Sequence, residues 1–97
     1  MTADRYTYTF PAATSPDEVA ATLLLAVTAA EGLYGPARVR LDAGYVLDPV
    51  APSCVIAAAT PVGRALNRLF AGFLAREFGP AAFTVERSAP GRIPATT

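Results

Sequence analysis

Polar and aromatic residues alternate near the start of the chain. In residues 5–10, RYTYTF, the side chains of Tyr6, Tyr8 and Phe10 fall on one face of an extended chain and the polar residues on the other. This alternation predicts a half-buried strand whose aromatic face points to the core. In the opposite orientation Tyr6 and Tyr8 would lie on an open sheet face and could stack on RNA bases, but only threonines would then face the core.

A first helix is expected over residues 16–33. Ser15 is the expected N-cap, Pro16 suits the first helical position, and Glu18 completes a capping box. The helix should end in the segment from Gly32 to Gly35. Its expected core stripe is Val19, Leu23, Val27 and Ala30, with Leu24 at the edge. Its expected outward side is Ala21, Thr22, Leu25, Thr28 and Ala29.

A second helix should begin after Thr60, which suits an N-cap, with Pro61 at its first position. Gly79 and Pro80 should end it. Its expected apolar stripe is Val62, Leu66, Leu69, Phe70 and Phe73, with Leu74 at the margin.

Three further segments have strand patterns. Residues 37–47 alternate, which predicts a strand, with a shorter strand and a turn at DAG as the alternative. Residues 48–52 contain two prolines and predict a loop. Residues 53–59 are apolar on both faces, as in a central strand, so the third strand begins at residue 45 or at residue 53. Residues 82–87 predict a last strand, with Phe83 and Val85 inward.

These elements predict an α+β domain of the ferredoxin-like βαββαβ type. It would have a four-stranded antiparallel sheet with two helices on one face, and right-handed crossovers would place the first and third strands centrally. The domain should span residues 1–88, followed by a flexible tail that contains Pro and Thr over residues 89–97. The open face of the sheet should present Arg5, Thr7, Thr9, Arg38, Arg40, Thr84 and Glu86.

The composition favours a protein that is covered by a partner. Hydrophobic residues make up 53% of the 97 residues and charged residues only 16%, which is low for a small domain with much surface to solvate. The net charge is zero, so we expect no binding to nucleic acid or to an anionic membrane. All eight basic residues are arginine and alanine is abundant, which is typical of a GC-rich bacterial genome.

Few residues offer catalytic chemistry. The chain has no histidine, and its one cysteine, Cys54, lies in an apolar strand pattern without basic neighbours, which predicts a buried structural thiol in a reducing compartment. We therefore expect no metal, no cofactor and no catalytic residue. A small enzyme using Asp and Arg stays an alternative. Asp42 and Asp48 would stand about 20 Å apart in an extended chain, unless the strand folds back at Gly44.

No targeting or membrane segment is expected. The first ten residues lack the apolar core of a signal peptide. The longest uncharged apolar stretch, residues 19–30, is shorter than the roughly 20 residues of a membrane span. We expect a cytoplasmic protein.

The outward sides of the two helices predict a docking surface. No charge occurs between Glu18 and Glu31, whereas ordinary exposed helix faces carry several. The expected contact residues, here called the docking face, are Leu25, Ala29, Arg64, Arg68, Ala71, Gly72, Ala75 and Arg76. We expect a non-enzymatic module that self-associates or joins a larger complex.

Two ligand hypotheses stand beside the docking hypothesis. One is a regulatory domain of the ACT type that senses a small ligand, although the loop after the first strand, PAATSP, suits it weakly. The other is a small anion at the start of the second helix, where backbone N–H groups and Arg64 are available. Most capped helix starts bind only their own cap, so the anion hypothesis is the less favoured of the two.

Overall fold

The computed structural model describes residues 5–48, 50 and 52–88. Seven elements follow one another along the chain: β1 (Arg5–Thr9), α1 (Pro16–Tyr34), α2 (Pro36–Asp42), β2 (Gly44–Asp48), β3 (Ser53–Ala57), α3 (Pro61–Phe78) and β4 (Thr84–Ser88). The predicted tail, residues 89–97, lies outside the described residues.

The strands form one four-stranded antiparallel sheet in the order β2-β3-β1-β4. The prediction of a mixed α+β domain with such a sheet is confirmed, and β1 and β3 are its central strands as expected. Tyr8 of β1 stands opposite Cys54 of β3 and Val85 of β4. Because opposite residues share a face, this register places Tyr8 and Cys54 together towards the core.

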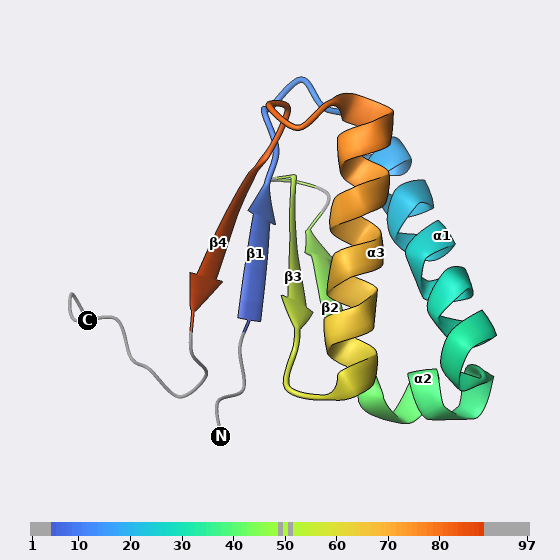
Figure 1. The fold of residues 1–97 in the computed structure, drawn as a ribbon. Coiled ribbons are helices and arrows are strands. Elements are labelled where there is room, and N and C mark those ends of the chain that lie inside the picture. The colour runs from blue at the N-terminus through green and yellow to red at the C-terminus, as the bar shows by residue number, and fades with distance from the viewer. Residues whose placement is uncertain (1–4, 49, 51, 89–97) are drawn as a thin grey trace.

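The core lies between the sheet and two long helices. α1 and α3 run side by side in opposite directions (Figure 1). They pack against the sheet face that carries Tyr8, Cys54 and Ile56, which are all at most 1% exposed. The aromatic face of β1 therefore points inward as predicted. The opposite orientation of β1 is wrong, because the Tyr8 ring is buried, although Tyr6 is only half-buried.

The predicted caps position the helices. Ser15 accepts a hydrogen bond from the Glu18 N–H at 3.4 Å, and Thr60 accepts one from the Gly63 N–H at 2.9 Å. Both long helices end at a glycine with positive φ, Gly35 at 90° and Gly79 at 93°. A side chain at that backbone angle is strained, so glycine is the residue that ends each helix at low cost.

A helix replaces the first part of the strand predicted over residues 37–47. The chain turns at Gly35, and Pro36 then occupies the first position of the seven-residue helix α2. Val39 is its one buried residue, while Leu41 is 83% exposed. The strand interpretation fails because tertiary packing of Val39 decides the conformation of so short a segment. The alternative of a shorter strand agrees better with the structure, since β2 begins at Gly44 and β3 at Ser53.

The faces of α1 and α3 also differ from expectation at several positions. Thr22, predicted to point outward, is 7% exposed, and its hydroxyl donates to the Glu18 carbonyl at 2.9 Å. Leu24, predicted at the edge of the core, is 65% exposed. Leu74, predicted at the margin, is fully buried, whereas Leu69 and Phe73 are half-buried. Both helices are thus rotated slightly from the orientation that residue type alone predicts.

The last strand and the open sheet face require two corrections. β4 begins at Thr84, so Phe83 precedes the strand and packs against the core, while Val85 is 43% exposed rather than buried. Arg38 and Arg40 lie on α2 and not on the open face. The other predicted open-face residues lie on β1 and β4, where Arg5, Thr9, Thr84 and Glu86 are exposed and Thr7 is half-buried.

Gly63 marks the closest approach between α3 and the sheet. A Cβ at this position would overlap the carbonyl oxygen of Ala57. We predict that Gly63→Ala destabilises the fold by about 1–3 kcal/mol, because backbone must move to admit the methyl group. Gly32→Ala in α1 is the matched control, since a Cβ there meets nothing within 4 Å, and it should stabilise by about 0.5–1 kcal/mol. Urea unfolding of both variants gives the comparison, and equal effects would contradict this packing.

Candidate functional site

The docking face lies on the outer surface of the helix layer, but its residues are unequally exposed. Five of its members are exposed and three are half-buried. The exposed residues are Leu25, Arg64, Arg68, Gly72 and Arg76, and the half-buried residues are Ala29, Ala71 and Ala75. α1 supplies two of the eight residues and α3 the rest, so the side-by-side packing of these helices brings the two groups onto one layer.

The orientation of α3 explains why its alanines are less exposed. The hydroxyl group of Tyr8 donates to the side-chain oxygen of Asn67 at 2.5 Å, so this flank of α3 faces β1. Ala71 follows Asn67 by one helical turn and packs against the core from the same flank. Arg68 and Gly72 therefore point outward more directly than Ala71 does.

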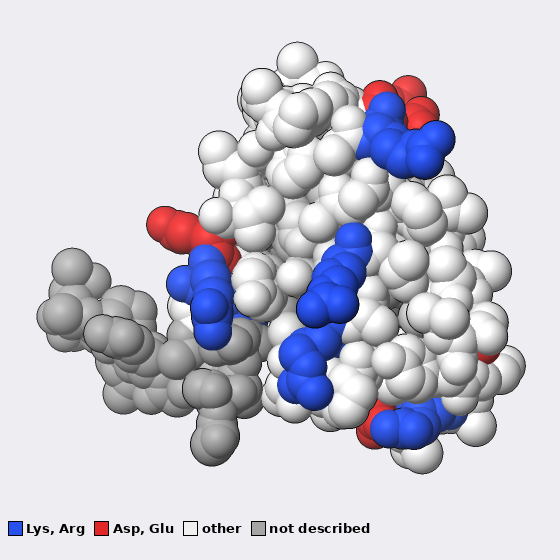
Figure 2. Space-filling model, viewed as in Figure 1, with Lys and Arg blue, Asp and Glu red and all other residues white. Residues whose placement is uncertain are grey.

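Charges are sparse over the helix layer. Figure 2 shows a largely uncharged surface there, with separate basic groups along α3. Leu24 and Leu25 of α1 are 65% and 56% exposed. An exposed pair of leucines on an uncharged helix face is unusual for a surface that only contacts water.

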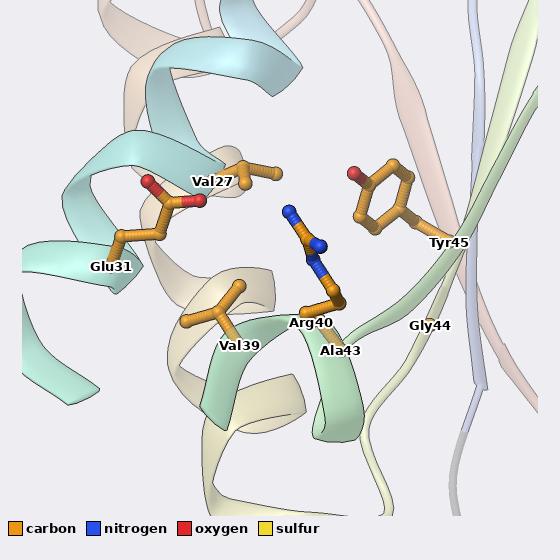
Figure 3. Close-up of a pocket in the computed structure, with 7 residues that line it drawn as sticks. All are labelled: Val27, Glu31, Val39, Arg40, Ala43, Gly44 and Tyr45. Atoms are coloured by element: carbon orange, nitrogen blue, oxygen red, sulfur yellow. The ribbon is translucent and has the colours of Figure 1, made fainter. Parts of the chain in front are cut away.

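A polar cleft lies where the end of α1, α2 and the start of β2 meet. Its volume is about 390 Å³, and it is lined by Val27, Glu31, Val39, Arg40, Ala43, Gly44 and Tyr45. Figure 3 shows the side chains of Glu31, Arg40 and Tyr45 directed towards one common space. Sequence reasoning missed this cleft because it placed Arg40 on a strand, and no spacing along the chain connects its three polar residues.

The two arginines of α2 have different surroundings. The Arg38 guanidinium pairs with the Asp42 carboxylate at 3.2 Å and lies 5.6 Å from the centre of the Tyr34 ring. In the part of the chain that the structure describes, the side chains of Arg40 and Glu31 form no hydrogen bond or ion pair. Both charges are therefore free to interact with a ligand in the cleft.

The start of α3 is occupied by the protein itself. The Thr60 hydroxyl accepts a hydrogen bond from the Gly63 N–H and donates one to the Asp42 carbonyl oxygen at 3.0 Å. Val62 and Gly63 are buried, and one Arg64 nitrogen lies 3.5 Å from the Ala59 carbonyl. These contacts already use the Gly63 N–H and one Arg64 nitrogen, two of the donors that the sequence offered to a small anion.

The residues considered for catalysis lie on three different elements: Cys54 on β3, Asp42 on α2 and Asp48 on β2. Cys54 is fully buried, and burial raises the pKa of its thiol to about 11, which disfavours the nucleophilic thiolate. Asp42 is held by Arg38, and Asp48 lies at the far end of β2. Among the described residues, no three His, Cys, Asp or Glu side chains gather in a way that could hold a metal ion.

Comparisons with known proteins add no relative: no family model, no curated protein and no solved structure matches this chain. In residues 5–48, 50 and 52–88, no single helix is long and apolar enough to cross a membrane. α1 and α2 reach that composition only together, across a bend of 117°.

The buried thiol gives a testable pH dependence. Because the folded-state pKa of Cys54 is about 11 against an ordinary value of 9.0, the thiol ionises more easily in the unfolded chain. We predict that stability is unaffected by this group below pH 9.0 and falls as the pH rises towards 11. Urea midpoints across this range should decline less steeply in Cys54→Ala. Identical slopes in the two proteins would show that Cys54 does not contribute.

Proposed function

We propose that this chain is a non-enzymatic self-association module with a ferredoxin-like fold. The strand order β2-β3-β1-β4 and the two strand–helix–strand crossovers support this fold type, with α2 as an addition before β2. The observation that favours self-association most is the uncharged outer face of α1 with Leu24 and Leu25 exposed. Two copies that pack these faces together remove the leucines from water.

The charges of the helix layer favour a second copy as the partner. α1 begins with exposed Asp17 and Glu18, while α3 presents Arg64, Arg68 and Arg76. In a two-fold pair the acidic start of α1 in one copy can face the arginines of α3 in the other, twice over. The zero net charge of the chain adds no repulsion to such a pair. Arg64, Arg68 and Arg76 thus form the polar rim of an apolar contact.

Gly72 gives independent support. It lies within α3, is exposed, and a Cβ there would meet nothing within 4 Å. A glycine inside a helix costs up to about 1 kcal/mol relative to alanine, and packing within one copy gives no reason for it. Close approach of a partner's backbone is a reason, because a side chain would hold the two surfaces apart.

An enzyme that uses Asp and Arg is less well supported. Asp42 is paired with Arg38, and the acidic residues of the described chain are scattered over different elements. The polar cleft favours ligand binding instead, as a second function beside self-association.

Leu25→Arg tests the proposed contact. We predict that the wild type is a dimer and that this variant is a folded monomer, with dimer affinity reduced at least about tenfold, because a buried leucine is replaced by a charge without a partner. Leu41→Arg, the same change at an 83% exposed position of α2, is the matched control and should stay dimeric. Light scattering gives the mass, and circular dichroism confirms folding.

Three results would overturn the proposed contact. The first is a monomeric wild type, and the second is dissociation of the dimer to the same extent by Leu25→Arg and Leu41→Arg. The third is dissociation by Val46→Arg but not by Leu25→Arg. Val46 is 68% exposed on the open face of the sheet, so that last result would assign the contact to the sheet.

A further inference from the structure

The polar cleft beside α2 contains opposite charges that do not neutralise each other. Glu31 reaches it from α1 and Arg40 from α2, and the Tyr45 hydroxyl reaches it from β2 (Figure 3). Glu31 and Arg40 form no ion pair with each other. An acidic and a basic group that border one hollow without pairing are suited to a ligand that has both charges itself.

We propose that this cleft binds a free α-amino acid with a small apolar side chain. The Arg40 guanidinium and the Tyr45 hydroxyl donate hydrogen bonds to the ligand carboxylate, since a planar guanidinium matches a carboxylate well. The Glu31 carboxylate accepts from the ligand ammonium group. Glu31, Arg40 and Tyr45 all belong to one chain, so this inference does not depend on the proposed self-association.

The remaining lining limits the size of the ligand side chain. The apolar part of the cleft is formed by the side chains of Val27, Val39 and Ala43, and Gly44 contributes its backbone. The volume of about 390 Å³ is at the small end of ligand sites in proteins. These features suit alanine or valine rather than an aromatic or a charged amino acid.

The fold holds the three polar residues in place from separate elements. Val39, next to Arg40, is 3% exposed and anchors α2 to the core. Gly35 with φ of 90° makes the turn that brings α2 across the end of α1. Tyr45 stands opposite the fully buried Ile56 in the sheet register. The cleft walls are therefore supported by the core, while the polar tips remain accessible.

The test is an NMR titration of the ¹⁵N-labelled protein with L-valine up to about 10 mM, a range that detects millimolar affinity. We expect saturable shifts at Glu31, Arg40 and Ala43–Tyr45. N-acetyl-L-valine lacks the ammonium group and L-valinamide lacks the carboxylate, so each should bind at least about tenfold more weakly.

Two arginine variants separate the site from a general effect of charge. Arg40→Gln should weaken valine binding at least about tenfold. Arg38→Gln removes the same charge two residues away, from a side chain that pairs with Asp42, and should leave binding unchanged. Glu31→Gln should weaken valine but not N-acetyl-L-valine.

Several outcomes would overturn the proposal. One is the absence of saturable shifts with both L-valine and L-alanine. Another is equal binding of L-valine and N-acetyl-L-valine, which would show that the cleft recognises only the carboxylate. A third is equal loss of binding in the Arg38 and Arg40 variants. Repeating the titration on Leu25→Arg separates this result from that of the proposed self-association.

Discussion

The burial of Tyr8 determines how the other elements are arranged. Its ring is 1% exposed and contacts the ring of Phe70 on α3 edge to face at 4.9 Å, and the ring of Phe83 before β4 lies 6.1 Å away. Its hydroxyl group is satisfied by Asn67. A buried hydroxyl without a partner costs free energy, so this bond sets the rotation of α3 about its axis. The positions of Arg68 and Gly72 on the outside follow from that rotation.

The same arrangement leaves two different surfaces available. The outer side of α1 and α3 is apolar and bordered by arginines, which favours a protein partner. The corner between α1, α2 and β2 is small and polar, which favours a small ligand. Because the surfaces use different residues, one can be altered without the other, although α1 contributes to both, Leu25 to the helix face and Glu31 to the corner.

Sequence patterns predicted the parts of this fold that local chemistry determines. Proline and cap residues located the starts of α1 and α3, and the strict alternation around Tyr8 gave the orientation of β1. Residues 36–42 were not predictable from periodicity, because Val39 and Leu41 also fit a strand and the helix depends on the turn at Gly35 and the tertiary packing of Val39. The burial of Thr22 depends on a bond to its own helix, which hydrophobicity does not register. The cleft could not be predicted from the sequence, since its polar residues Glu31, Arg40 and Tyr45 come from three different elements.

In the proposed dimer, the acidic start of α1 in one copy meets Arg64, Arg68 and Arg76 on α3 of the other copy. Native mass spectrometry of a mixture of two charge-reversed variants tests this contact. One variant carries Arg68→Glu and Arg76→Glu, and the other carries Asp17→Lys and Glu18→Lys. Each variant alone should be monomeric because like charges face each other, and the mixture should form a heterodimer because both contacts become attractive again. Dimers of either variant alone, or no heterodimer from two folded monomers, would contradict this arrangement of the dimer.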